Sequence, residues 1–428
     1  MTTGSGMLPV GVELFRNRNF SLLWVGALTS STGSTAVTLV FDWFVFTQTH
    51  QVLLLALMGV IEFGPTLTLG VLAGAFVDRH DRRHVMLASD VARAAILGSI
   101  AIYVILFGFS YWLLVGAVLA VGILGTFFGP ASNALLPKLV REGELTSANG
   151  FLQTGATVAQ LLGSPLGGAL VAFFGAGAAL AFNSGTYAIS ALCVLLLAIP
   201  LSSFTAPKPK EERKSIASET LEGFRYIRSQ RALLLMTLVS SATNFFSFYV
   251  LYLVVYANQV LRTSAFGLGI LLGLIAVGGG IGGLIVPRLG LDRTPGIWVP
   301  LAWGLSGLPL VALFALPSLP FALASMLSLG ITNAFVNVTF LSTVQRVVPD
   351  QLLGRYLATT QTLVFAMTPV GIVTGGFLVL GFGVAASFLI AGVGTALLAW
   401  SLLLSPSVRR WGAHPSPENP LGEVSARA

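Results

Sequence analysis

The chain contains little charge and a single cysteine. Asp, Glu, Lys and Arg make up 9% of its 428 residues, whereas about a quarter of a soluble protein is charged. The one cysteine, Cys193, excludes a disulfide framework, and the four histidines are too dispersed for a metal-binding spacing. No glycine-rich loop ends in Lys followed by Ser or Thr, so ATP is not expected to be the energy source. We predict no cofactor, no metal and no enzyme activity.

Long apolar runs take the place of the missing charge. Hydrophobic residues make up 55% of the chain, and they gather in twelve runs of about the 20 residues that a membrane-spanning helix needs. The sequence therefore predicts an all-α membrane protein with twelve transmembrane helices. The predicted spans are residues 20–46, 52–77, 84–106, 111–128, 149–174, 178–199, 232–257, 266–289, 296–316, 320–340, 353–380 and 381–404.

The positive charges predict how the helices are oriented. They are scattered through short connections rather than gathered in one patch, which argues against nucleic acid as a partner. With the N-terminus in the cytoplasm, 21 of the 23 Lys and Arg residues fall on the cytoplasmic side, all except Arg93 and Arg262. Cytoplasmic loops of membrane proteins carry this excess of positive charge. We therefore predict a multi-pass protein of the cell inner (plasma) membrane with both termini in the cytoplasm.

The two halves of the chain repeat each other. Residues 74–79, Gly-Ala-Phe-Val-Asp-Arg, are echoed by residues 283–288 at an offset of 209, and Gln153 falls opposite Gln361 at an offset of 208. Duplicated halves of a transporter place the substrate site near the middle of the membrane. The predicted parts are a cytoplasmic N-terminal segment (1–19), an N-terminal six-helix bundle (20–201), a cytoplasmic central linker (202–231), a C-terminal six-helix bundle (232–404) and a disordered cytoplasmic tail (405–428).

The connection between the second and third predicted helices concentrates charge in a few residues. It holds Gly74, Asp78, Arg79, Arg82 and Arg83 in the spacing Gly-x-x-x-Asp-Arg-x-x-Arg-Arg. This spacing resembles the loop signature of the major facilitator superfamily, which implies a latch that joins the two halves of a transporter on the cytoplasmic side. The alternative is a basic loop that only fixes the orientation of the helices.

Further motifs narrow the resemblance. Residues 62–65 (Glu-Phe-Gly-Pro), 89–94 (Ser-Asp-Val-Ala-Arg-Ala) and 129–137 (Gly-Pro-Ala-Ser-Asn-Ala-Leu-Leu-Pro) are similar to the branch that contains macrolide-efflux proteins and enterobactin exporters. The resemblance implies the major facilitator fold, with two pseudo-symmetric six-helix bundles, and secondary transport. It does not identify the substrate.

Four charged residues lie inside predicted spans: Asp42, Glu62, Asp90 and Arg93. A charge at the centre of a spanning helix costs roughly 2.5–3.5 kcal/mol on insertion scales, so a functional role is the default expectation. Glu62 lies about ten residues, or about 15 Å, into its helix and so near the middle of the membrane. There it could bind and release a proton, since loss of water favours the neutral form of a carboxyl group. The alternative is a structural carboxyl at a break in its helix.

The other three charges have two interpretations each. Asp42 is a second candidate for proton coupling near the outer mouth, and the favoured alternative is a solvated residue at the end of its helix. Asp90 and Arg93 stand three residues apart and so share one helix face. We predict that they anchor the latch formed by Asp78 and Arg79, with a purely structural ion pair as the alternative.

Small residues in the fifth predicted helix favour close packing of helices. They are Gly155, Gly163, Pro165, Gly167 and Gly168. The arrangement resembles the glycine and proline signature of antiporters in the superfamily, although the proline sits one position later than in that signature. The resemblance implies export.

Polar side chains are sparse in the predicted spans. Each of them is individually more typical of packing than of ligand contact, but together they are the candidates for a substrate cavity. A sparsely polar, aromatic-rich lining suits a large amphipathic or lipophilic compound, whereas a sugar or amino acid would need denser hydrogen-bonding groups. The cavity candidates are Gln153, Gln160, Asn244, Tyr249, Tyr252, Asn333, Asn337 and Gln361.

These features together predict a secondary transporter. It would export a hydrophobic or amphipathic small molecule (a drug, a macrolide-like or a siderophore-like compound) by proton antiport and alternating access, with Glu62 as the preferred proton carrier. The expected partners are the substrate, protons and the lipid bilayer, and the protein is expected to be a monomer. Two alternatives stay open: uptake or facilitated transport of a lipid-like metabolite on the same fold, and a non-transporting receptor or assembly factor.

Overall fold

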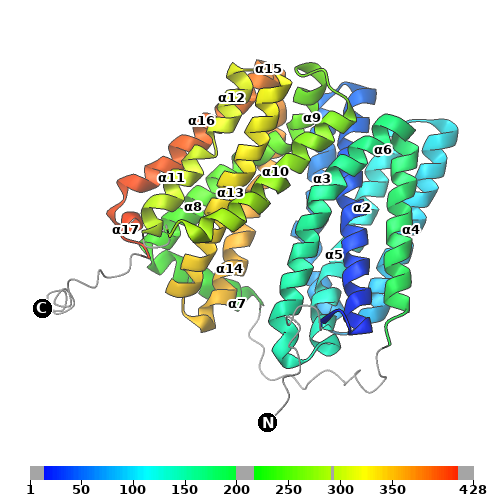
Figure 1. The fold of residues 1–428 in the computed structure, drawn as a ribbon, viewed down its shortest axis with the longest axis horizontal. Helices are drawn as coiled ribbons and strands as arrows, with labels where there is room; N and C mark the ends of the chain where they lie inside the picture. The colour runs from blue at the N-terminus through cyan, green and yellow to red at the C-terminus, as the bar shows by residue number, and fades with distance from the viewer. Residues whose placement is uncertain (1–13, 199–215, 291–293, 413–428) are drawn as a thin grey trace, which may run out of the picture. The chain divides into compact units, whose positions relative to one another are not determined.

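All regular secondary structure in the described part of the chain is helical. The structure is a computed structural model that describes residues 14–198, 216–290 and 294–412 (Figure 1). Short 3₁₀ segments extend or join several helices. The α-helices are α2 (Arg18–Thr49), α3 (Val52–Val77), α4 (Arg82–Phe107), α5 (Tyr111–Leu139), α6 (Leu145–Leu195), α7 (Ile216–Ser229), α8 (Arg231–Phe245), α9 (Tyr249–Gln259), α10 (Ala265–Ile285), α11 (Pro295–Leu305), α12 (Leu308–Ala315), α13 (Leu319–Val347), α14 (Asp350–Phe365), α15 (Met367–Phe382), α16 (Val384–Ser401) and α17 (Pro406–Arg409).

The helices account for all twelve predicted spans. Within the described residues, ten helical stretches are long and apolar enough to cross a membrane. One of them, α6, contains two predicted spans, because the chain turns sharply at Gly175 (φ 83°, ψ 169°), a conformation that glycine adopts readily. The first predicted span is α2, which is not among the ten and carries many serines and threonines.

Short polar caps separate the helices from their connections. The side chains of Asn17 and Asp81 accept hydrogen bonds from the first backbone N–H groups of α2 and α4. At the other ends, α2 stops at His50 (φ 52°) and α4 at Gly108 (φ 83°). Such left-handed or glycine-dependent residues are common helix terminators. The connections on both sides of α3, residues 50–51 and 78–81, are only a few residues long.

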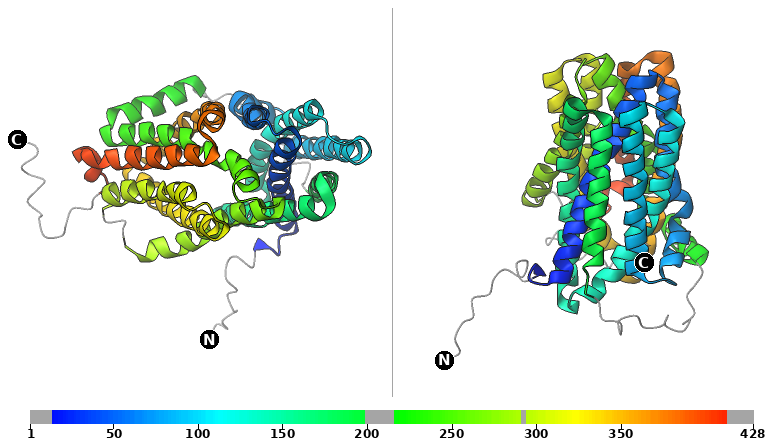
Figure 2. Two further views of the ribbon diagram at one scale, coloured as in Figure 1. Left: turned by 90° about the horizontal axis from the view of Figure 1, so that it is seen from above. Right: turned by 90° about the vertical axis from the view of Figure 1, so that its right-hand side faces the viewer.

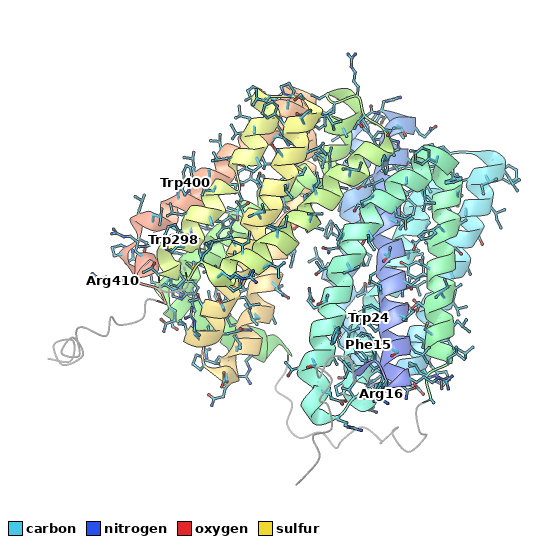
Figure 3. The ribbon with its side chains drawn as sticks, in the orientation of Figure 1. Phe15, Arg16, Trp24, Trp298, Trp400 and Arg410 are labelled. Atoms are coloured by element: carbon cyan, nitrogen blue, oxygen red, sulfur yellow. The ribbon has the colours of Figure 1, made fainter. Side chains whose placement is uncertain are left out.

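The chain forms two compact units, and the first is built mainly from the N-terminal half. Unit 1 comprises Met1–Arg213, Phe248–Ala276 and Ile372–Ala385. In it α6 packs along α2 and α4, while α5 lies beside α3 and α4 (Figures 1 and 2). Helix α9 lies against α2 and α3. An aromatic cluster covers one end of unit 1, where the Phe15 ring (Figure 3) lies 5.2 Å from that of Trp24.

Unit 2 comprises Lys214–Ser247, Val277–Gly371 and Ala386–Ala428. Helices α7 and α8 lie against α14, and α13 lies beside α11 and α12. The Trp400 indole of α16 (Figure 3) packs on α11 and donates a hydrogen bond of 3.4 Å to the carbonyl oxygen of Leu301.

The predicted division of the chain into five parts stays a prediction. Residues 1–13, 199–215 and 413–428 lie outside the described residues, and with them most of the predicted terminal segment, the first part of the linker and most of the tail. The start of the tail, predicted to be disordered, is instead ordered, because α17 packs there with Val408 and Trp411 buried. The rest of the predicted linker contains helix α7.

Candidate functional site

Helices α2 and α3 bring two acidic side chains together. Thr38 Oγ1 donates a hydrogen bond of 2.7 Å to Glu62 Oε1, and Asp42 lies one turn further along α2. The carboxyl groups of Asp42 and Glu62 interact electrostatically. Asp42 Oδ1 is buried and has no hydrogen-bond partner among the described residues. Asp42 as a whole is half-buried, so both interpretations of this residue stay predictions. Helix α3 runs through Pro65 without the break that the sequence suggested beside Glu62.

A stripe of hydroxyl groups leads along α2 to this acid pair. Ser30, Ser34, Thr38 and Asp42 follow one another at intervals of four residues and so lie on one helix face. The Ser34 hydroxyl lies 2.8 Å from the Tyr187 hydroxyl of α6. Of these four residues only Asp42 was among the predicted site residues, and the three hydroxyl groups do not stand out in a helix that carries many other serines and threonines.

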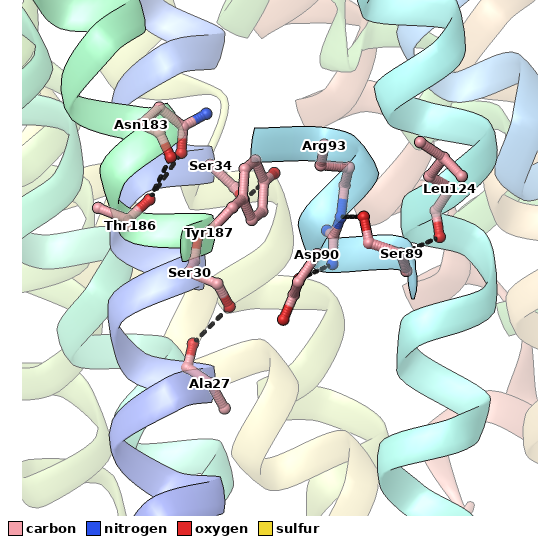
Figure 4. A network of polar contacts seen from close by, with 10 residues as sticks. All are labelled: Ala27, Ser30, Ser34, Ser89, Asp90, Arg93, Leu124, Asn183, Thr186 and Tyr187. Atoms are coloured by element: carbon pink, nitrogen blue, oxygen red, sulfur yellow. Dashed lines mark hydrogen bonds and ion pairs between the residues drawn. The ribbon is translucent and has the colours of Figure 1, made fainter. Parts of the chain in front are cut away.

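A charged pair on α4 lies beside this stripe inside unit 1, and Tyr187 contacts both (Figure 4). Asp90 and Arg93 of α4 form an ion pair and are 0% and 6% exposed. The Arg93 guanidinium carbon lies 4.3 Å from the centre of the Tyr187 ring and 5.0 Å from that of Phe128. Arg93 also donates to the backbone carbonyl of Ser89 at 3.3 Å. These contacts are those of the structural ion pair that the sequence left as the alternative, and an anchoring role toward Asp78 and Arg79 stays a prediction.

The connection between α3 and α4 orders the ends of three helices. The backbone N–H of Asp78 bonds to the Gly74 carbonyl at the end of α3. Arg83 reaches across to the end of α6, where its Nε donates to the Val194 carbonyl at 3.2 Å and its Nη2 to that of Leu195 at 2.5 Å. This arrangement places a cation at a helix C-terminus, where the helix dipole favours it.

Three other members of the predicted latch, Gly74, Arg79 and Arg82, make fewer contacts. Arg79 is exposed, and the Arg82 Nε is buried without a hydrogen-bond partner among the described residues. A Cβ atom added at Gly74 would meet nothing within 4 Å, so Gly74 is not at a close backbone approach in this structure. The latch itself stays a prediction.

The predicted cavity residues of unit 1 differ in their accessibility. Gln153 and Gln160 are exposed on α6, and Tyr249 is partly buried at the start of α9. Tyr252 is 0% exposed, and its hydroxyl donates a hydrogen bond of 2.6 Å to the carbonyl oxygen of Ile372. In this conformation Tyr252 therefore joins α9 to α15 and lines no open cavity.

In unit 2, the side-chain oxygen Oδ1 of Asn244 accepts a hydrogen bond of 2.6 Å from the Thr368 hydroxyl. The amide of Asn244 is therefore partly engaged within the unit. Asn333 and Asn337 lie on successive turns of α13, and the Asn337 side-chain amide donates a hydrogen bond of 2.9 Å to the backbone carbonyl of Asn333. Gln361 is exposed on α14. Within the described residues no three His, Cys, Asp or Glu side chains are grouped to hold a metal ion.

Small residues let α6 approach two neighbouring helices. A Cβ atom on Gly155 would come 3.2 Å from the Trp24 indole nitrogen, and one on Gly163 would come 2.8 Å from the Thr32 carbonyl, both on α2. On a second face of α6, a Cβ atom on Gly168 would overlap the backbone of Ala265, at the start of α10. Pro165 contributes to this second face, because a Cβ on Gly273 would lie 2.8 Å from its ring.

A Gly167→Ala substitution is expected to destabilise the protein by about 1–3 kcal/mol, as overpacking of a core does. The new methyl group would overlap the Ala36 backbone, which cannot rotate away as a side chain can. The measurement is thermal unfolding of detergent-purified protein. Gly185→Ala, in the second span of α6, is the control, since its Cβ would meet nothing within 4 Å. Equal melting temperatures for the two variants would contradict the close packing of α2 and α6.

Comparison with known proteins identifies the family of the chain. The sequence model of the Major Facilitator Superfamily matches residues 23–372, most of the chain. The protein belongs to the major facilitator superfamily. The resemblance predicted from the loop spacing is thus confirmed, and the protein is a multi-pass membrane transporter for a small molecule and not an enzyme.

Distant relatives of this major facilitator protein include efflux proteins. The multidrug efflux pump Tap of Mycolicibacterium fortuitum is 25% identical over 401 residues, which cover 91% of this chain and 96% of the relative. Macrolide efflux protein A of Streptococcus pyogenes is 22% identical over 382 residues, covering 87% and 92%. The crystal structure of a bacterial homolog to the human lysosomal transporter Spinster, inward-facing and unoccupied, has a TM-score of 0.72 at 16% identity and covers 96% and 100%. This likeness confirms the predicted fold class.

Proposed function

We propose that the protein exports a hydrophobic or amphipathic small molecule from the cytoplasm in exchange for protons, by alternating access of its two halves. The observation that carries this proposal is the acid pair of α2 and α3. Glu62 accepts a hydrogen bond from Thr38, and the buried Asp42 Oδ1 has no hydrogen-bond partner among the described residues. An ionisable group inside a spanning helix marks an ion or proton pathway by default, because its burial is costly.

Two sequence features support the direction and the kind of cargo. Both relatives named above, Tap and macrolide efflux protein A, are named as efflux proteins. Among the predicted cavity residues, the exposed side chains are the amides of Gln153, Gln160, Asn337 and Gln361. A site with few hydrogen-bonding groups suits a large lipophilic compound, such as a drug, a macrolide-like or a siderophore-like molecule.

The distribution of positive charge supports the orientation. With both termini in the cytoplasm, the connection that holds Asp78 and Arg79 lies on the cytoplasmic side of the plasma membrane, as does α7. In this orientation the acid pair lies within the membrane, where protons from outside can reach it when the outer side opens.

The test is transport by the purified chain in vesicles that contain a pH-sensitive dye. Lipophilic drugs and macrolides are added under an imposed pH gradient, and the expected result is substrate movement against its own gradient coupled to opposite proton movement. An uncoupler should abolish accumulation but leave exchange of labelled for unlabelled substrate. Substrate and protons moving in the same direction would contradict antiport and favour uptake.

A further inference from the structure

Helix α7 leaves one of its faces uncovered. Leu221 and Phe224 on this face are 55% and 41% exposed, and Arg225 and Arg228 are exposed as well. At about 100° per residue the four side chains fall within an arc of about 100°. Among the described residues neither arginine has an ion-pair partner. The uncovered face therefore combines two large apolar groups with two unpaired positive charges.

The opposite face of α7 is fixed to unit 2. A Cβ atom on Gly223 would lie 2.7 Å from the Arg355 carbonyl of α14, and Ile227 is 0% exposed in the core of the unit. The Glu222 carboxylate accepts a hydrogen bond of 2.6 Å from Arg355. Because these contacts hold the helix in one rotation about its axis, Leu221 and Phe224 are kept turned away from α14.

The chain connectivity places α7 at the membrane surface. Gln230 alone separates the end of α7 at Ser229 from the start of α8, and residues Arg231–Gln259 form a candidate membrane span. With 14 residues, α7 is only about 21 Å long, too short and too charged to cross the hydrocarbon layer itself. Its exposed apolar side chains are thus not explained by a position within the membrane core.

We propose that the uncovered face of α7 binds the acidic phospholipid headgroups of the bilayer surface. Leu221 and Phe224 enter the boundary between headgroups and acyl chains, and Arg225 and Arg228 pair with phosphate groups. Helices that lie in the membrane interface have this composition, and long arginine side chains can extend from a buried stem to the headgroups.

The experiment uses the full chain with Cys193→Ala and Leu221→Cys, carrying a nitroxide at position 221. The protein is reconstituted in vesicles of neutral phosphatidylcholine or of phosphatidylcholine with phosphatidylglycerol. In the acidic vesicles the nitroxide is expected to be accessible to oxygen, which dissolves in lipid, and protected from a water-soluble nickel reagent. An Arg225→Gln/Arg228→Gln pair should weaken this protection by roughly fivefold for each arginine lost.

The matched control is Arg409→Gln/Arg410→Gln, which removes the same charge from the exposed residues at α17 and should leave the protection unchanged. Protection that persists in neutral vesicles at high salt would overturn the role of the arginines. A nitroxide equally open to water in both vesicles would overturn the proposal. Protection that arises only after a cytosolic protein is added would assign the face to a protein partner instead. Accessibility to oxygen and to the nickel reagent does not depend on transport. Failure of the lipid-binding proposal would therefore leave the export proposal intact.

Discussion

An Asp90→Asn variant is expected to lose about 3–5 kcal/mol of folding stability, because it leaves a buried charge without a partner. Asp90 is 0% exposed and forms an ion pair with Arg93. Asparagine keeps the size of the side chain but removes its charge, so the guanidinium stays between the rings of Phe128 and Tyr187 without a counter-charge. The measurement is thermal unfolding of the detergent-purified variant beside the wild type.

Two further variants separate lost pairing from lost packing. Asp90→Leu/Arg93→Met removes both charges and is expected to recover most of the lost stability, since a buried ion pair gains little over apolar side chains of similar volume. Tyr187→Phe removes the hydroxyl group that contacts Ser34 but keeps the ring over Arg93, and should cost only about 0.5–1.5 kcal/mol. A wild-type melting temperature for Asp90→Asn would contradict a structural role for the pair.

The sequence predicted the helices well because membrane insertion depends on local composition. A run of about 20 apolar residues must be helical in lipid, where every backbone polar group needs an internal partner. The close packing of α6 was predictable for a similar reason, since glycines such as Gly163 and Gly167 in an apolar helix let a neighbouring helix approach. The bend at Gly175 was predictable only as a gap between two spans.

The partners of the charged side chains could not be predicted in the same way. The spacing of Asp90 and Arg93 predicts that they pair with each other, but not that aromatic rings from α5 and α6 enclose them. The two interpretations of Asp42, a candidate for proton coupling or a solvated residue at a helix end, could not be separated from the sequence, because its distance to Glu62 depends on how α2 and α3 pack. Tyr252 was predicted to line a cavity, and its fully buried hydroxyl bonds a carbonyl of α15 instead. Contacts between helices depend on rotation and register, and composition specifies neither.

A Glu62→Gln variant is expected to lose substrate-induced proton release, down to the level of protein-free vesicles. Glutamine has the shape of the protonated carboxylic acid and can still accept the hydrogen bond from Thr38, but it can neither bind nor release a proton. Accumulation of substrate driven by a pH gradient should be lost with it. Exchange of labelled for unlabelled substrate needs no net proton movement and should continue, which shows that the variant is folded and able to bind its cargo.

Variants of the neighbouring residues locate the proton within the acid pair. Thr38→Val removes the hydrogen bond but leaves the carboxyl group, so coupled transport should be reduced and not abolished. Asp42→Asn removes the second acid, which interacts electrostatically with Glu62, and should shift the pH dependence of transport while proton release continues. If Asp42→Asn abolishes proton release and Glu62→Gln does not, Asp42 is the carrier. If the double variant Asp42→Asn/Glu62→Gln, which leaves no acid in α2 or α3, still releases protons as the wild type does, the acid pair does not couple transport.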